Sequence, residues 1–531
     1  MSKFIEGLKQ ETNWKLTENG QDALVSTTDD LLDLFATIGA LRNRKEEDII
    51  NLFSKAFYQD KLLAMKILFY SRNIRGLGQG ERRTFRIIAK WMAETYPEIM
   101  KKNLHLIAGF GRFDDLYVFV GTPLEKDAFE IIKKQWHIDH GNYLAATKYA
   151  NYIGSKVNYC DGEKHADVTS SVSLLAKWLK SVNTSSEESN KLGKLTSKYL
   201  GLSEKDYRKR LSALRSYLKI IEKKMSNNKW EEINYSQVPS KAMTNYRNAF
   251  VKHDEERFNN YIESVSKGEV KINASALYPY DLVAKVFKNS GGFGSYRKYK
   301  HDEVIEQQWR ALPNYIEGEN NILVMADTSG SMTWGGEGNV KAIDISISLA
   351  VYFAERNKGA YKDKFITFSS RPSFIELKGE KLVEKLSCIP DICESTNLEA
   401  AFDLVLNTAV KNSLTSEDLP KSIIVISYME FDSCVYNNSQ ASYYNSVNRW
   451  TFYDTMKNKY AQYGYTIPNI VFWNVNARNN TFHAFSEYEG VQMASGASPS
   501  VFQSILTGNS KTPIDLMMEV LNNSVFDCVT I

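Results

Sequence analysis

The spacing of apolar residues divides the chain into two parts. From about Leu31 to Gln308 the apolar positions recur at helical intervals, broken by short Gly, Asn or Pro punctuation. The clearest segments are 48–58, 62–71, 81–95 and 207–225. Alternating strand patterns of comparable length are absent from this sequence stretch, so we predict an all-α N-terminal half. Helices of this size, stacked in pairs, would form a helical-repeat (HEAT-like) solenoid or ring.

After Trp309 the pattern changes to short apolar runs that alternate with amphipathic helices. Residues 312–320 are expected to form the linker. Strands are expected at 322–326, 365–369, 422–427, 470–474 and 491–494, and helices at 341–356, 398–411, 450–463, 498–506 and 513–522. This order predicts an α/β, Rossmann-like domain with a mostly parallel sheet covered on both faces. We therefore expect a multidomain protein, divided into residues 1–315 and 316–531.

Charge is distributed unevenly between these two parts. The formal net charge of the 531 residues is only +3. Residues 316–531 carry 16 Lys and Arg against 24 Asp and Glu, a net charge of −8, which leaves +11 on the first 315 residues. An anionic partner would therefore meet the N-terminal half.

Cysteine usage and hydropathy indicate the compartment. The cysteines are odd in number and form no Cys-x-x-Cys pair, which argues against a disulfide framework or a structural zinc site. They are Cys160, Cys388, Cys393, Cys434 and Cys528. The N-terminus lacks the apolar core of a signal peptide, and no apolar run approaches the length of a membrane span. We expect a cytoplasmic protein with no membrane partner.

The segment Asn190–Trp230 is the most basic in the chain, with twelve Lys and Arg against three acids. Such a run is usually a solvated helix face. However, Tyr199, Tyr207, Tyr217 and Trp230 are interleaved with the cations, a combination that suits phosphate attraction with base stacking. The segment is therefore a candidate for RNA binding. Its candidate contacts are Lys205, Arg208, Lys209, Arg210, Arg215 and Lys219.

Two glycine-rich basic loops leave two interpretations open. Segment 71–83 joins two helices with three glycines and four arginines, and it lacks both the Gly-Lys-Ser/Thr ending and the preceding strand of a nucleotide-binding loop. It is either a connection with salt-bridging arginines or a phosphate contact through Arg72, Arg75, Arg82 and Arg83. Segment 288–301 is likewise either a connection or a loop that orders on RNA.

The apolar run 322–326 ends in polar residues with alternate spacing. Asp327, Ser329 and Ser331 lie on a turn that contains Gly330, so one carboxylate and two hydroxyls can point at one spot. In open α/β sheets ligands bind at the carboxyl ends of the strands, where Asp327 falls. Oxygen ligands of this kind suit a hard cation.

Asp327-Thr-Ser-Gly-Ser331 resembles the Asp-x-Ser-x-Ser signature of von Willebrand factor A domains, whose metal-ion-dependent adhesion site (MIDAS) takes Mg²⁺. Thr396 matches the threonine of the second loop in that family. The resemblance thus implies a predicted metal set of Asp327, Ser329, Ser331 and Thr396, with Mg²⁺ as the cofactor.

The third loop departs from the A-domain pattern, because Tyr428 stands where that family normally has an aspartate. A missing carboxylate weakens Mg²⁺ binding. Either Glu430 or Asp432 substitutes through a water, or the loop has lost the metal and the motif persists as a network that caps backbone donors.

The order of a basic helical region and an A-type domain resembles the Ro autoantigen (TROVE) family, RNA-binding proteins whose helical repeats form a ring. More closely, the chain resembles an uncharacterised family of Ro-like proteins with a C-terminal A domain. The blocks that carry this resemblance are 207–215, 222–226, 230, 235–240, 253–254 with 257–258, 271–274, 427–432, 471–474 and 494–496. It implies a ribonucleoprotein in which the helical region binds structured or misfolded noncoding RNA.

We expect a binding protein rather than an enzyme. The motif at Asp327 lacks the second aspartate of Asp-x-Asp phosphotransferases, and no Gly-x-Ser-x-Gly elbow surrounds Ser331. The pair His137 and His140 lacks a third spaced ligand for zinc. The prediction is an RNA-binding scaffold. The alternative is a Mg²⁺-dependent protein interaction module that captures an acidic side chain of a protein partner and binds no RNA.

Overall fold

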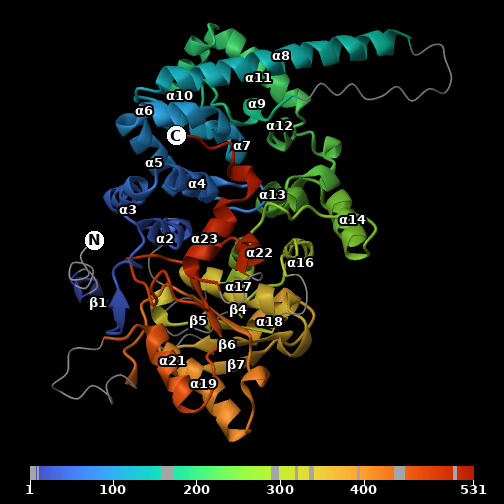
Figure 1. The fold of residues 1–531 in the computed structure, drawn as a ribbon. Helices are drawn as coiled ribbons and strands as arrows, with labels where there is room; N and C mark the ends of the chain where they lie inside the picture. The colour runs from blue at the N-terminus through green and yellow to red at the C-terminus, as the bar shows by residue number, and fades with distance from the viewer. Residues whose placement is uncertain are drawn as a thin grey trace. The chain divides into compact units, whose positions relative to one another are not determined.

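The chain forms two compact units, each assembled from separate stretches of sequence. The computed structural model describes residues 8, 11–156, 172–288, 298–316, 321–333, 340–390, 395–435, 449–505 and 511–531 (Figure 1). Unit 1 consists of residues 1–85, 239–248 and 257–527, and unit 2 consists of residues 86–238, 249–256 and 528–531. The expected helical N-terminal region and C-terminal sheet are both present.

Unit 1 contains a sheet of six strands in the order β10-β9-β8-β5-β6-β7. The strands are β5 (Ile322–Asp327), β6 (Lys364–Phe368), β7 (Ser373–Glu376), β8 (Ser422–Ser427), β9 (Asn469–Asn474) and β10 (Val491–Ser495). Neighbours are parallel except for β7, which runs antiparallel to β6. All six residues of β5 are buried, which is why the central strand reads as a continuous apolar run. The predicted, mostly parallel sheet is confirmed.

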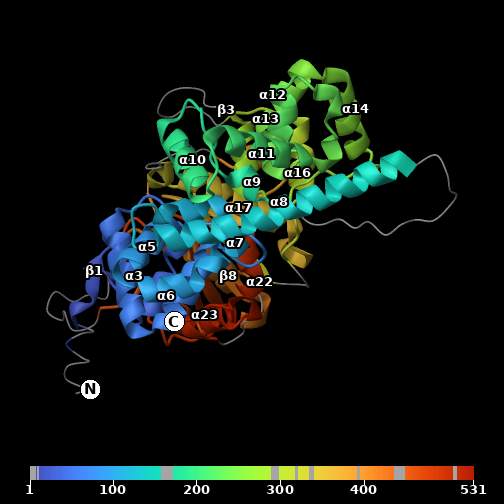
Figure 2. The ribbon, with the colours of Figure 1, turned by 90° about the horizontal axis from the view of Figure 1, so that it is seen from above.

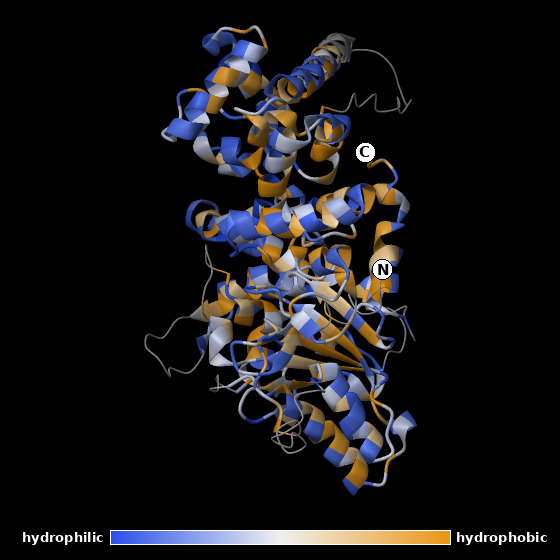
Figure 3. Ribbon diagram, turned by 60° about the vertical axis from the view of Figure 1, so that its left-hand side comes forward, coloured by the Kyte–Doolittle hydropathy of each residue, from blue (hydrophilic) through white to orange (hydrophobic). Residues whose placement is uncertain are grey.

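Helices cover both faces of this sheet. α17 (Ala342–Arg356) lies on one side, and α19 (Leu398–Lys411) and α21 (Phe452–Gln462) lie on the other (Figure 1). α17 contacts β5, β6 and β8 and is buried along most of its length. The shorter helices α18 (Leu382–Ser387), α22 (Phe502–Ile505) and α23 (Pro513–Leu521) complete this part. Figure 3 shows the strands as hydrophobic ribbons and the helices with mixed hydropathy.

Unit 1 also includes much of the sequence before residue 316. The helices α2 (Asp30–Phe35), α3 (Glu46–Gln59), α4 (Lys61–Arg72), α14 (Glu255–Ser266), α15 (Pro279–Val286) and α16 (Glu303–Arg310) lie largely within it. The Trp309 indole meets the Tyr352 ring edge to face, with centroids 6.4 Å apart, and its Nε1 donates to Glu355. The compact unit that carries the sheet therefore draws on both sides of the boundary expected at residue 316.

A hairpin near the N-terminus belongs to the same unit. Strands β1 (Trp14–Leu16) and β2 (Asp22–Leu24) pair antiparallel, and we call residues 14–24 the N-terminal hairpin. Leu24 exchanges two backbone hydrogen bonds with Phe482, at 2.9 and 3.1 Å. The hairpin is thus fastened to a loop that follows β9.

Unit 2 is helical. Its longest helix is α8 (Glu125–Lys156), drawn in cyan in Figure 2, and it also holds α6 (Pro97–Asn103), α7 (Ile107–Phe110), α9 (Leu175–Trp178), α10 (Glu187–Tyr199), α11 (Glu204–Tyr217) and α12 (Ile221–Ser226). α5 (Arg83–Thr95) and α13 (Ser240–His253) cross the unit boundaries. The residue Asn103 bonds both backbone groups of Thr530. These helices vary widely in length, and the solenoid or ring stays a prediction.

Among the residues that the structure describes, none of the helices combines the length and the apolar character that crossing a membrane requires.

Candidate functional site

The predicted metal set gathers at the carboxyl end of β5. Asp327, Ser329 and Thr396 are fully buried, and Ser331 is half-buried. Oδ1 of Asp327 accepts the Ser329 backbone N–H at 2.9 Å, and Oδ2 accepts the hydroxyl of Ser427 at 2.5 Å. Both carboxylate oxygens of the set are therefore already engaged by groups of the chain.

Burial is the largest cause of the shift in the pKa of Asp327. It raises the pKa of this carboxyl from 3.8 to about 6, and the negative charge of Asp432 adds to the rise. Hydrogen bonds from Ser427 and Ser329 act in the opposite direction. An ionised Asp327 is thus held by neutral donors in a place that disfavours charge.

The third loop, Tyr428–Asp432, places its tyrosine against the set. Tyr428 is 1% exposed, its hydroxyl oxygen lies 3.5 Å from Thr396 Oγ1, and it also hydrogen-bonds the Ser331 side chain. Asp432 Oδ1 accepts the backbone N–H of Thr396 at 3.0 Å. Tyr428 therefore bridges the first and second loops from the position where the resemblance places an aspartate.

Glu430 does not serve as the substitute ligand in this arrangement. Its side chain is buried and accepts the hydroxyl of Thr481 at 2.6 Å, the amide of Asn479 at 3.3 Å and the backbone N–H of Glu18 at 2.8 Å. These bonds direct the Glu430 carboxylate toward the N-terminal hairpin. Asp432 instead anchors the backbone of Thr396, as a cap would.

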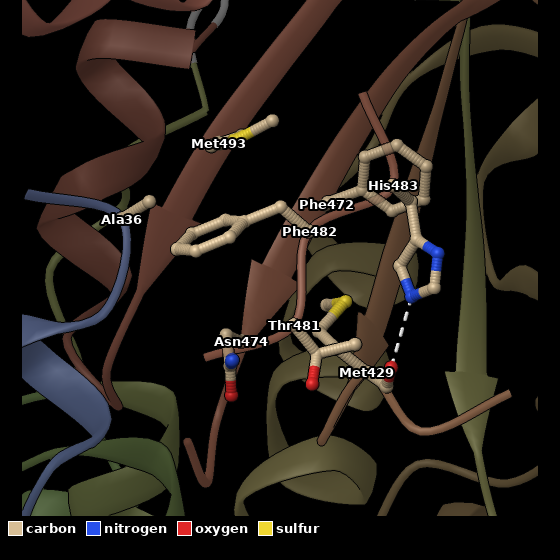
Figure 4. A pocket seen from close by; sticks show the side chains of 8 residues that line it. All are labelled: Ala36, Met429, Phe472, Asn474, Thr481, Phe482, His483 and Met493. Atoms are coloured by element: carbon tan, nitrogen blue, oxygen red, sulfur yellow. Dashed lines mark hydrogen bonds between the residues drawn. The ribbon is translucent and has the colours of Figure 1, made fainter. Parts of the chain in front are cut away.

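A buried histidine fixes the backbone of the third loop. Nε2 of His483 donates to the carbonyl of Met429 at 2.9 Å, and Met429 has φ +70°, a left-handed conformation that needs such support (Figure 4). Burial lowers the pKa of His483 from 6.5 to about 4, so the imidazole is neutral. Its ring lies 4.4 Å from that of Phe431.

The space beside this histidine is a small pocket with mostly apolar walls (Figure 4). It is lined by Ala36, Met429, Phe472, Asn474, Thr481, Phe482, His483 and Met493. The polar side chains in its lining are those of Asn474, Thr481 and His483, and Met429 of the third loop forms part of its wall.

Two residues outside every motif complete the neighbourhood of the set. The Arg478 guanidinium donates to the carbonyl of Ser331 and lies 4.8 Å over the ring of Tyr428. The amide of Asn19 donates to Thr396 Oγ1 at 3.3 Å and to the Tyr428 hydroxyl at 3.1 Å. Neither residue belongs to a pattern that sequence reasoning could have singled out.

This arrangement does not fit Mg²⁺. A magnesium ion needs about six oxygen lone pairs in octahedral geometry. Here the Asp327 oxygens and Thr396 Oγ1 accept hydrogen bonds from the chain, and a guanidinium cation stands beside Ser331. Ser329 Oγ is the one buried oxygen of the set that lacks a partner within hydrogen-bond geometry among the described residues. The same part of the chain holds no group of three or more His, Cys, Asp or Glu that could bind a metal.

The predicted RNA contacts in the basic segment divide into two kinds. Lys205, Arg208, Lys209, Arg210 and Lys219 are exposed. Arg215 is a structural residue, because its guanidinium donates to the carbonyls of Ala176 and Leu179 and to the Ser181 hydroxyl at 2.7–2.9 Å. It ties α11 to α9 and to the residues that follow α9, and it is not available to a phosphate in this conformation.

Three of the four aromatic residues of the segment are packed against other side chains of the chain. Tyr207 is fully buried and donates to the carbonyl of Lys180. Tyr199 stacks on Phe129 with ring centroids 4.2 Å apart, and Trp230 stacks on His253 at 4.5 Å. Tyr217 is the exposed member, 37% accessible. The physical reason for the burial of Tyr207 is the helical period, which places it on the same face of α11 as Leu211 and Leu214.

The four arginines of the first glycine-rich loop also differ in exposure and in hydrogen bonding. Arg72 is 2% exposed, which excludes it as a surface contact, and Arg83 donates to the carbonyls of Arg42 and Arg44. Arg75 and Arg82 are exposed. For the second loop, residues 289–297 lie outside the described residues, as does Glu394 beside Thr396.

Two family models match the chain. The model described as "Domain of unknown function (DUF2828)" matches residues 17–143 and 146–321, which is more than half of the chain. The chain belongs to the DUF2828 family. In this DUF2828 protein the remaining residues 321–523 match the model described as "Domain of unknown function (DUF7788)". The matched regions meet at residue 321, at the start of the sheet.

Similar proteins come from a virus and a bacterium. The DUF2828 chain is 27% identical to "Uncharacterized protein L728" of Acanthamoeba polyphaga mimivirus over 556 residues, which cover 98% of this chain and 89% of the viral protein. It is also similar to the crystal structure of the Deinococcus radiodurans Ro (RSR) protein, at 13% identity and a TM-score of 0.38, over 93% of this chain and 99% of that chain. At that score we take no site or function from the Ro structure.

Proposed function

We propose that the chain is an RNA-binding scaffold whose contact surface is the exposed basic face of α10 and α11. Exposed cations recur on α10 at helical spacing, at Lys191, Lys194 and Lys198. On α11 they recur at Lys205, Arg208 and Lys209. This double row of accessible cations is the observation that carries the proposal. We call these six residues the basic face.

The two rows lie close together. Helices α10 and α11 contact each other, and Lys194 Nζ approaches Glu204 Oε1 at the start of α11 to 4.0 Å. That ion pair is exposed on both sides, so it contributes little and a phosphate can replace the carboxylate. When such a surface binds phosphates, it releases the counterions that were condensed on the RNA, and RNA binding therefore depends on salt. The resemblance to Ro-like proteins and the net charge of +11 on residues 1–315 support the same proposal.

The surface favours backbone contact over base recognition. Since Tyr207 is buried and the half-buried rings of Tyr199 and Trp230 already stack on Phe129 and His253, few rings remain to stack on unpaired bases. We therefore expect recognition of the shape and charge of structured RNA, with weak dependence on sequence.

Salt-dependent binding tests this proposal. The probe is a fluorescently labelled RNA with a duplex stem and one single-stranded end, titrated by anisotropy at several salt concentrations. The test variant combines Lys205→Glu, Arg208→Glu and Lys209→Glu. The control variant combines Lys358→Glu, Lys378→Glu and Lys411→Glu, which changes the net charge equally at exposed positions of unit 1.

The test variant should bind at least tenfold more weakly than the control, and the slope of log K against log salt should fall by about 2–3 for three lost phosphate contacts. If wild type binds no RNA, or if both variants lose affinity equally, the basic face is not the site.

A further inference from the structure

The N-terminal hairpin inserts its tip into the neighbourhood of the predicted metal set. Besides Thr396 and Tyr428, the Asn19 amide donates to the carbonyl of Glu430 at 2.6 Å. One side chain thus touches the second loop and two positions of the third loop. All of these residues lie in unit 1.

The backbone of the hairpin tip is fastened along the same loop. Thr17 Oγ1 donates to the carbonyl of Phe431 at 2.6 Å, and Ser433 donates its N–H to the carbonyl of Asn19 at 3.3 Å. Gly20 forms an antiparallel bridge with Asp432, and Cys434 donates its N–H to Gln21 Oε1. The Asn19 side chain is therefore held in place by bonds on both sides of it.

Arg478 supplies the positive charge of this junction. Its guanidinium touches the Ser331 carbonyl and the Tyr428 ring, and Glu18 of the hairpin is its counter-ion, with Nη1 and Oε2 3.5 Å apart. A divalent cation at the set would meet this guanidinium at close range, and like charges in a partly buried place repel.

We infer that Arg478 takes the place of the metal ion at the predicted metal set and that Asn19 takes the place of the ion's external ligand. The set is then a metal-free junction that holds the N-terminal hairpin. Thr396 Oγ1, the hydroxyl that the resemblance assigns to the metal, already accepts the Asn19 amide at 3.3 Å and lies 3.5 Å from the Tyr428 hydroxyl. The cation of the junction is the fixed Arg478. The inference does not depend on RNA binding, which concerns unit 2.

Metal titration of the full chain is the first test. Mn²⁺ binding is followed by electron paramagnetic resonance, and Tm is measured in EDTA and in millimolar Mg²⁺. Wild type should show no saturable Mn²⁺ site and the same Tm in both buffers. Saturable binding, or a Tm that rises with Mg²⁺ and falls with EDTA, overturns the inference.

A second test asks whether Asn19 holds the junction. In Asn19→Ala, hydrogen–deuterium exchange of peptides covering residues 428–434 should accelerate several-fold. The control, Asn412→Ala, removes an exposed amide at the end of α19 and should leave that region unchanged. Unchanged exchange in Asn19→Ala would show that the side chain does not occupy the site.

A third test restores the negative charge of a metal site and removes the positive charge of Arg478. Tyr428→Asp combined with Arg478→Met restores a carboxylate at the third loop and removes the guanidinium. This variant should gain Mn²⁺ binding that wild type lacks. If the variant is folded, as judged by circular dichroism, and binds no more Mn²⁺ than wild type, Arg478 does not stand in for the cation. If the variant does not fold, the Mn²⁺ titration of the wild-type protein decides.

Discussion

Two arginines of α11 that look alike in sequence should respond differently to the same substitution. Arg208 is exposed, whereas Arg215 donates three hydrogen bonds to Ala176, Leu179 and Ser181. Methionine replaces either arginine with a neutral side chain of similar length. The pair therefore separates a structural role from a contact with RNA.

The magnitude for Arg215→Met follows from the lost bonds. A hydrogen bond from a charged donor contributes roughly 1.5–3 kcal/mol, and such losses are not additive. Because the side chain is half-buried, water replaces part of what is lost, and we expect about 3 kcal/mol. For a domain of the size of unit 2, that corresponds to a Tm lower by about 6–12 °C. Arg208→Met should change stability by less than about 0.5 kcal/mol.

The assay combines calorimetry with RNA anisotropy on the same preparations. Arg215→Met should melt earlier and, below its Tm, bind RNA almost as wild type does, since a guanidinium engaged with carbonyls offers no contact. Arg208→Met should show the reverse. If Arg215→Met melts like wild type and loses RNA affinity, our account of this arginine is wrong and the sequence-based assignment of Arg215 as an RNA contact is right.

The remaining predictions concern the core of unit 1. His483 is held neutral with a pKa of about 4 against 6.5 in an unfolded chain, so its contribution to stability is complete above pH 6.5 and is lost as the pH falls toward 4. Compared with His483→Gln, wild type should lose about 3 kcal/mol of unfolding free energy over that range in denaturant titrations. The effects of the raised pKa values of Asp33 and Asp327 are common to both proteins and cancel in this difference. A difference that stays constant with pH would contradict the assignment. Gly496 has φ +94°, and an added Cβ would meet Gln79 Oε1 at 2.1 Å and Gly39 Cα at 3.2 Å. Gly496→Ala should therefore cost about 1–3 kcal/mol in thermal unfolding, whereas Gly330→Ala, where a Cβ meets open space, should cost less; equal effects would refute the clash.

The sequence was sufficient for features that depend on local periodicity. The apolar run 322–326 and the alternating helices predicted the parallel sheet, and the motif at Asp327 was correctly placed at the end of its strand. The same periodicity, applied to Tyr207, Leu211 and Leu214, would have placed Tyr207 inside, because these residues share one helix face. Tyr207 was instead assigned to an RNA surface, because its basic and aromatic neighbours were given more weight than the helical spacing.

Features that depend on distant pairing could not be predicted. Asn19 and Tyr428 are 409 positions apart, and nothing local marks either as the partner of the other. The edge strand β7 is short and only partly buried, so its apolar signal was too weak to detect. Arg72 and Arg215 were assigned to the surface because charge alone does not reveal that Arg72 is buried or that Arg215 bonds to backbone carbonyls.

The pairing of the N-terminal hairpin with the third loop also sets an order of events during synthesis. At roughly 5–20 residues per second, a ribosome needs about 20–80 s to add the 409 residues between Asn19 and Tyr428. During that time the Asn19 side chain lacks its partners Tyr428 and Glu430, and Thr17 Oγ1 lacks the carbonyl of Phe431. Unit 1 therefore cannot complete its native contacts co-translationally from its N-terminus, and its last folding steps must wait until the strands after β8 have left the exit tunnel.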